Sequence, residues 1–212
     1  MREIIRSAFP AALAAALACA IAPASTARAD AGPGAFRLGS DLRVLTLLHY
    51  PEDGEVHVQA GVFGTDLFLA LRPQLVVSGA YQLNDSILIG ARVGFGYQEL
   101  VLGPFTLDTG VIGVLPFFEY MFGNGTVRPF VGAEAGFQIA FIEEVSLGGS
   151  GDLEAEALAI AGGLGGVHIF LADGFSLTPG VAFDFLYWGG NEWAGYQIVF
   201  FLSLEGWIGG RG

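Results

Sequence analysis

Residues 116–141 read PFFEYMFGNGTVRPFVGAEAGFQIAF, and the rest of the chain is interpreted from this stretch. Asn124-Gly125 predicts a tight hairpin turn, because a turn of the primed type needs positive φ at both central residues. Beyond the turn, apolar residues alternate strictly with glycines and polar residues. This pattern predicts a strand with lipid on one side and a polar interior on the other. The apolar face holds Val127, Pro129, Val131, Ala133, Ala135, Phe137, Ile139 and Phe141, and the mixed face Arg128, Phe130, Gly132, Glu134, Gly136, Gln138 and Ala140.

The composition favours a barrel over a helical membrane protein. Hydrophobic residues make up 53% of the 212 residues, and the mean hydropathy of +0.57 is high for a soluble protein. Outside the N-terminus, no apolar run reaches the roughly 20 residues that a transmembrane helix needs. A barrel strand instead places a small or polar residue at every second position. The 33 glycines fit a close-packed barrel interior.

The N-terminus has the pattern of a secretory signal. Arg2 and Arg6 form a positive n-region, residues 11–22 an apolar core, and Ala27-Arg28-Ala29 a cleavage site. The sequence therefore predicts four parts: a cleaved signal peptide over 1–29, a linker over 30–35, a barrel over 36–208 and a tail over 209–212.

The N-terminus allows two other interpretations. An uncleaved anchor would need a longer apolar run. A lipoprotein processed at Cys19 would prefer leucine where Ala16 stands. With cleavage after Ala29, the only cysteine leaves with the signal, which excludes redox chemistry, cysteine nucleophiles and disulfides.

The charge excludes two classes of partner. The chain has no lysine, nine arginines and a formal net charge of −12. Nucleic acids are bound through Lys/Arg patches, and anionic headgroups through polybasic segments. The sequence therefore predicts no nucleic-acid partner.

Alternation along the whole chain predicts an all-β fold, an eight-stranded antiparallel up-and-down transmembrane β-barrel. Short connections at 83–85, 122–125 and 171–174 alternate with longer, mostly acidic ones near 51–65, 99–106, 143–153 and 189–194. Outer-membrane barrels combine tight periplasmic turns with longer outer loops in this way. A run of glycines over 162–166 suggests a bulge. The expected strands are about 36–50, 67–82, 86–98, 107–121, 127–141, 154–170, 175–187 and 195–208.

Outward side chains complete the predicted membrane surface. In the first strand, Leu48 is assigned to the lipid face together with Phe36 and Leu42. Aromatic residues near both ends of the strands predict two interfacial girdles. Tyr81, Phe118, Tyr120 and Phe175 lie beside the short turns, and Tyr50, Tyr97, Phe141, Tyr187 and Tyr196 beside the long loops.

The hairpin also resembles a known family. Residues 116–120, the Gly-Asn-Gly turn and residues 128–137 look like the middle hairpin of the small bacterial outer-membrane barrels, the OmpA/OmpX-like family. The strand pattern extends this resemblance over about 36–208. The resemblance implies a location in the bacterial outer membrane. Such barrels usually end on an aromatic residue used in assembly, whereas this chain continues through Trp207 to Gly212.

Ten charged residues fall on the inward faces of the predicted strands. An eight-stranded barrel is just wide enough for its side chains to fill the interior, so these groups are expected to pair across the lumen and close it with a polar core. Arginine suits this role because its planar fork serves several carboxylates. The alternative is a gated narrow pore, since ionisable residues within a membrane are functional candidates. The predicted network consists of Arg37, Arg43, Arg72, Arg92 and Arg128 with Asp41, Glu119, Glu134, Asp184 and Glu205.

The sequence predicts neither an enzyme nor a cofactor. His49, His57 and His168 are the only imidazoles and are too scattered to suggest a metal site. A lipid-modifying hydrolase would need a serine presented to a histidine, and no His-x-Ser occurs. The acidic residues of one long loop could bind a divalent cation through hard oxygen ligands, or form a solvated, repulsive surface, which we favour. They are Glu143, Glu144, Asp152, Glu154 and Glu156.

The predicted function is that of a monomeric, non-enzymatic outer-membrane barrel with a closed lumen, which supports membrane integrity or surface interaction. Its partners would be outer-membrane lipid and a surface ligand at the acidic loops. One alternative is a narrow channel for small or apolar solutes, and another is a lipid-modifying enzyme.

Overall fold

A computed structural model of the protein describes residues 32–49, 56–60, 75–102, 105–146, 153–172, 174–188 and 193–209. The predicted signal peptide, Tyr50, Arg72 and tail residues 210–212 lie outside these ranges. No described residue belongs to a helix long and apolar enough to cross a membrane. The strands are β1 (Phe36–His49), β2 (Val56–Ala60), β3 (Leu75–Gln82), β4 (Ile87–Leu102), β5 (Phe105–Met121), β6 (Val127–Ser146), β7 (Leu153–Ala172), β8 (Phe175–Trp188) and β9 (Trp193–Ile208).

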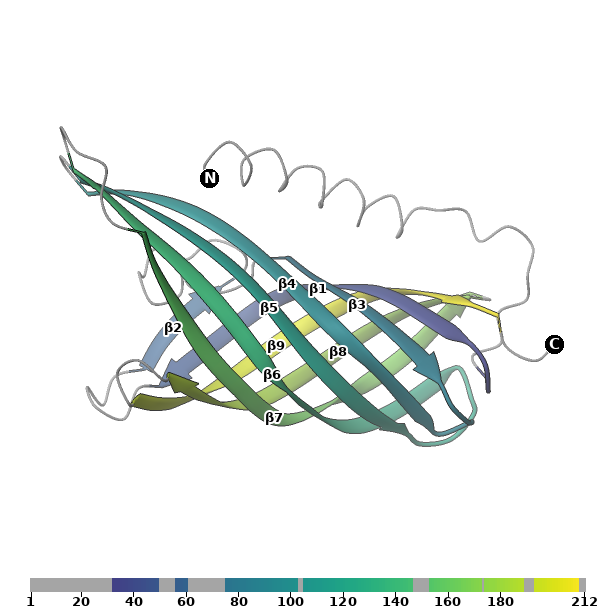
Figure 1. Ribbon diagram of the computed structural model, residues 1–212. Coiled ribbons are helices and arrows are strands. Elements are labelled where there is room, and N and C mark those ends of the chain that lie inside the picture. Colours follow the sequence, from purple (N-terminus) through teal and green to yellow (C-terminus); the bar gives the residue numbers. More distant parts are fainter. Residues whose placement is uncertain are drawn as a thin grey trace.

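These strands close into a barrel (Figure 1). Each strand from β3 to β8 pairs antiparallel with the next, and β1 pairs with β9 from Phe36↔Ile208 to His49↔Tyr196. On its other edge, β1 pairs first with β3 and then, over Leu45–His49, with β2. Because β2 and β3 share one position beside β1, the barrel has eight strands, and the predicted fold is confirmed.

The alternation of residues 127–141 is confirmed, but the turn before them differs from the prediction. Val131 and Phe137 are exposed on the outer surface, while Phe130 and Glu134 are buried inside. The left-handed residue of the turn is Gly123, with φ 75°, and not Gly125. The predicted primed turn at Asn124-Gly125 is therefore wrong.

A wider connection takes the place of that tight turn. The Phe122 amide donates to the Pro129 carbonyl over 2.8 Å, so the chain reverses over residues 123–128. The Arg128 side chain folds over this segment, and its Nε donates to the Gly125 carbonyl over 3.1 Å. The Gly125 carbonyl, which a two-residue turn would leave exposed to solvent, is thus hydrogen-bonded.

A bulge in β1 changes which side chains enter the barrel. The register against β9 shifts between Arg43 and Leu45. Because a bulge adds one residue to one strand, it moves every later side chain to the other face. Leu48 is therefore buried in the lumen, 0% exposed, and its predicted place on the lipid face is wrong. The bulge expected within residues 162–166 is also wrong, because β7 is regular there and shifts at Phe170/Ala172 instead.

Strands occupy much of two predicted loops. β4 and β5 pair as far as Leu102↔Phe105, so strand residues occupy most of the predicted loop over 99–106. β6 continues to Ser146 and pairs with β5 over its whole outer part, leaving only 147–152 before β7. Figure 1 shows β4, β5 and β6 extending past the other strands at this end. We name the opposite end, with the connections 83–86, 122–126 and 173–174, the turn end.

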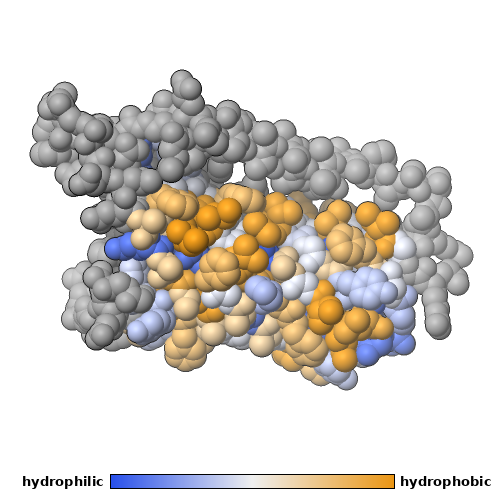
Figure 2. All heavy atoms as spheres, in the orientation of Figure 1, coloured by the Kyte–Doolittle hydropathy of each residue, from blue (hydrophilic) through white to orange (hydrophobic). Residues whose placement is uncertain are grey.

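The outer surface of the barrel is largely apolar (Figure 2). Large hydrophobic side chains such as Phe137, Phe185 and Phe200 stand exposed there, as a lipid-facing belt requires. Of the predicted girdle residues that the structure describes, Tyr81, Phe118, Tyr120, Tyr187 and Tyr196 are exposed, and Tyr97, Phe141 and Phe175 are half-buried.

Candidate functional site: the charged lumen

The lumen is filled by alternating polar and apolar groups rather than by a polar core alone. Charged side chains from six strands meet inside the barrel beside two apolar clusters. The first cluster includes Leu88, Met121 and Trp207 near the turn end, and the second includes Leu48 and Leu186 farther along the same barrel. Apolar side chains therefore accompany the predicted polar groups in the lumen, partly because the β1 bulge turns Leu48 inward.

Glu119 of β5 is the junction of the charge network. Its side chain is 0% exposed. Arg37 of β1 donates to both carboxylate oxygens, from Nη1 to Oε2 over 2.8 Å and from Nη2 to Oε1 over 3.2 Å. Arg92 of β4 donates to Oε1 over 3.4 Å, and Nε2 of His168 on β7 lies 3.4 Å from Oε2. One carboxylate thus ties three cationic or polar side chains from three other strands across the lumen.

Glu205 of β9 is a second junction on the turn-end side. Its Oε1 lies 3.1 Å from Arg37 Nη1, and its Oε2 lies 2.9 Å from His168 Nδ1. Ser176 and Thr178 of β8 each donate a hydroxyl hydrogen to Oε2 over 2.7 Å. A buried carboxylate with several donors is well compensated for its lost hydration.

Arg92 holds the central part of the network. Its Nε donates to Asp41 Oδ2 over 3.1 Å, and its Nη1 forms an ion pair with Glu134. The guanidinium also lies over the Phe117 ring, 4.5 Å from its centroid. Arg92 therefore faces three carboxylates, counting Glu119, and a cation–π partner.

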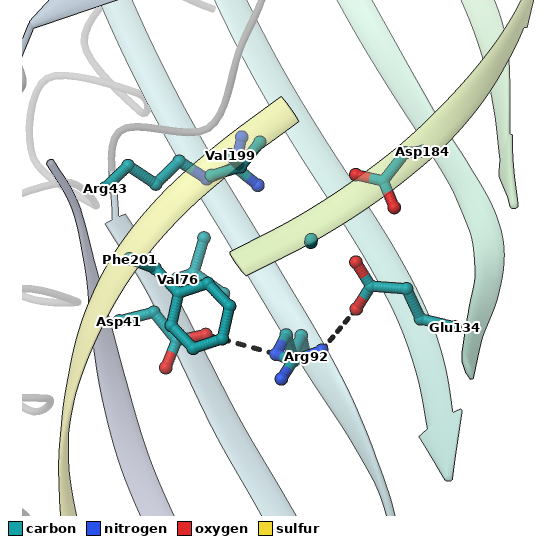
Figure 3. A pocket seen from close by; sticks show the side chains of 9 residues that line it. Asp41, Arg43, Val76, Arg92, Glu134, Asp184, Val199 and Phe201 are labelled. Carbon is teal, nitrogen blue, oxygen red and sulfur yellow. Dashed lines mark hydrogen bonds and ion pairs between the residues drawn. The ribbon is translucent and has the colours of Figure 1, made fainter. Parts of the chain in front are cut away.

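A small cavity lies beside this central part (Figure 3). Its volume is about 30 Å³, and its polar lining consists of Asp41, Arg43, Arg92, Glu134 and Asp184. Figure 3 shows the Glu134 and Asp184 carboxyls facing each other, with Arg43 across the cavity. Val76, Ala182, Val199 and Phe201 form its apolar lining.

Eight of the ten predicted network residues lie inside the described barrel: Arg37, Asp41, Arg43, Arg92, Glu119, Glu134, Asp184 and Glu205. Arg72 lies outside the described residues. Arg128 lies at the turn end, where it donates to turn carbonyls and stacks over Phe170 with 4.8 Å between guanidinium carbon and ring centroid. Glu134 and Glu119 form ion pairs with Arg92.

His168 was not predicted as part of the lumen. It is 0% exposed and stacks on Phe130, with 4.5 Å between ring centroids. The signal in the sequence was positional, because residue 168 has the same parity as the inward Gly162 and Gly166 in β7. Because glycines stand on both faces over residues 162–166, the sequence alone does not show which face His168 takes.

The site lacks the arrangement that a hydrolase needs. Ser176, His168 and Glu205 do meet, but the Ser176 hydroxyl donates to the carboxylate and accepts a hydrogen bond from Trp207 Nε1 over 2.8 Å. A nucleophile needs a base to take its proton and room for a substrate. All three side chains are buried. Within the described ranges, no group of three His, Cys, Asp or Glu side chains could hold a metal ion.

Solved structures with the same architecture are known. The crystal structure of Neisserial surface protein A matches with a TM-score of 0.57 at 13% identity, over 82% of this chain and 98% of that chain. Ail, the attachment invasion locus protein of Yersinia pestis, matches with a TM-score of 0.51 at 10% identity, over 82% and 99%. Its complex with the heparin analogue sucrose octasulfate gives 0.55, 8%, 82% and 99%.

The fold is that of a small outer-membrane barrel. The resemblance predicted from the central hairpin is thus confirmed for the fold, and the predicted outer-membrane location agrees with these neighbours. The sequence itself matches no protein-family model and no curated protein.

Proposed function

We propose that the protein is a non-enzymatic, monomeric barrel of the bacterial outer membrane with a closed lumen, and that it serves membrane integrity or surface interaction. The observation that carries this proposal is the junction at Glu119. Arg37, Arg92 and His168 reach it from three strands, so side chains join across the lumen at one level.

Apolar layers support the same proposal. Along β1 and β8, Leu48 and Leu186 follow the charged Arg43 and Asp184 on the side away from the turn end, and both leucines are buried. Toward the turn end, Trp207 and Phe130 pack beside His168. A solute would have to pass an apolar layer, a charge network and a second apolar layer.

Single-channel recording tests the closed lumen. We expect purified protein in planar bilayers to give no steady conductance, because an eight-stranded barrel is filled by its own side chains. A matched recording from Arg92→Ala shows whether loss of the central guanidinium alone lets ions pass. Steady conductance from the unaltered protein would refute the closed-lumen proposal.

A narrow channel for small solutes is the second candidate. The cavity between Arg43 and Asp184 favours it, because it shows that the filling is incomplete at one level. The same recordings decide between the two functions.

A heat-dependent gel shift tests the membrane location. We expect the protein in the outer-membrane fraction, and the unboiled sample to migrate differently from the boiled one, because a closed barrel resists detergent until heated. A cytoplasmic marker protein serves as the fractionation control. Recovery in the periplasm without a shift on boiling would contradict the proposal.

Charge limits the surface ligands. One neighbour, Ail, was solved with a heparin analogue, which is a polyanion. The present chain has a net charge of −12 and no lysine. Because like charges repel, a polyanionic ligand is a poor candidate here, and a cationic or neutral surface ligand is the better one.

A further inference from the structure

Asp184 has a carboxylate oxygen that accepts no hydrogen bond from the part of the chain that the structure describes. The side chain is 2% exposed and lines the lumen cavity. Its Oδ2 accepts a hydrogen bond from Gln197 Nε2 over 2.7 Å, but Oδ1 is buried without a hydrogen-bond partner. Figure 3 shows this carboxyl directed toward Glu134 and the cavity. Buried polar atoms are nearly always hydrogen-bonded, so this oxygen indicates a missing partner.

The charges around the cavity do not balance. Three carboxylates, Asp41, Glu134 and Asp184, face two guanidiniums, Arg43 and Arg92. Arg92 is engaged with Asp41 and Glu134. Arg43 lies across the cavity without a close ion pair to these carboxylates among the described residues, while Asp184 faces the Glu134 carboxyl and accepts a hydrogen bond from the neutral Gln197 amide. With all three carboxyls ionised, one negative charge is left over, and an uncompensated buried charge is strongly unfavourable.

The size of the cavity restricts what could supply the positive charge. A water molecule needs about 10–15 Å³ of such volume, and the cavity has about 30 Å³. It can therefore hold one small ion with a water molecule, but not an organic cation. Calcium would need six to eight oxygen ligands, and the described residues contain no cluster of three metal-binding side chains.

We propose that the cavity between Glu134 and Asp184 binds one small monovalent cation, with Asp184 Oδ1 as its principal protein ligand. Hard carboxylate oxygens suit alkali ions such as sodium, and water completes the shell. Gly162 makes the site available, because a Cβ there would lie 2.3 Å from Asp184 Oδ1. This inference goes beyond the proposed function and holds whether or not the lumen conducts.

The test measures stability in sodium chloride against N-methyl-D-glucamine chloride at equal ionic strength, so that general screening is matched. The protein, folded in detergent micelles, is unfolded by heat and followed by the gel shift. We expect a midpoint a few degrees higher in sodium at concentrations well above the dissociation constant, because a ligand that binds only the folded state stabilises it. Sodium NMR line broadening reports the bound ion directly.

Two variants test the site, one by removing its negative charge and one by removing the competing positive charge. Asp184→Asn keeps an acceptor for Gln197 but removes the charge, and we expect it to abolish both the sodium-specific shift and the line broadening. Arg43→Gln removes the opposing guanidinium and should tighten sodium binding several-fold. Asp85→Asn, in an exposed turn, is the control and should behave like the unaltered protein. Equal midpoints in both salts for the unaltered protein, or an unchanged sodium response in Asp184→Asn, would overturn the proposal.

Discussion

Replacing Arg92 with alanine is expected to lower the free energy of unfolding by about 3–5 kcal/mol, the cost of breaking a buried ion pair on one side. The variant would leave Asp41, Glu134 and part of Glu119 without their shared cation. It would also remove the group that lies over the Phe117 ring. Urea unfolding of the barrel in lipid vesicles, followed by tryptophan fluorescence, measures the change.

Arg128→Ala is the matched control for this prediction. Both substitutions delete one guanidinium from the same barrel, but Arg128 is half-buried at the turn end and donates to turn carbonyls. Its stacking on Phe170 is a cation–π contact between two half-buried side chains, close to the exposed case, for which about 0.5–1 kcal/mol is typical. We therefore expect a loss of about 1 kcal/mol. A loss for Arg128→Ala equal to that for Arg92→Ala would show that the charge network is not organised around Arg92.

The contrast between these two arginines shows what the sequence alone can predict. Alternation assigns a face to each residue within a regular strand, and it placed Arg92 and Glu134 inside correctly. It does not fix the stagger between strands, which decides the height of each side chain in the lumen. Glu134 pairs with Arg92 of β4, 42 positions earlier in the chain, and not with Arg128 of its own strand. Only the register of the closed barrel brings those two side chains to one level.

Irregularities set the other limit. No Gly or Pro marks the bulge at Arg43/Leu45 in the sequence. The bulge nevertheless moves the later side chains of β1 to the opposite face and buries Leu48. In β7 the reverse happened, because the glycine run over 162–166 suggested a bulge where the pairing is regular. The burial of His168 was missed for that reason. The sequence thus predicts which segments form strands and in what order. It does not predict which face a side chain takes after a bulge, or which charged side chains pair across the lumen.

The position of the glycines leads to the second large effect, in Gly162→Ala. A Cβ at Gly162 would lie 2.2 Å from the Phe183 carbonyl oxygen and 2.7 Å from the Asp184 Cα. These atoms belong to the backbone of β8, which cannot move without disturbing its pairing with β7. We expect a loss of about 1–3 kcal/mol, the usual cost of overpacking, or failure to form the heat-shifted band on an unboiled gel.

Gly163→Ala is the control one residue away, because it changes the same residue type in the same strand but faces outward. Its Cβ would have only the Gly132 carbonyl oxygen near it, at 3.7 Å, an ordinary contact. Alanine also restricts the unfolded chain more than glycine, so we expect unchanged stability or a gain of about 0.4–1 kcal/mol. The two substitutions are expected to change stability in opposite directions because β7 keeps its alternation through residues 162–166, so that Gly162 faces inward and Gly163 outward. Equal unfolding midpoints for the two variants would mean that β7 and β8 can separate enough to admit a methyl group, and that the close approach seen between them is not needed for the barrel.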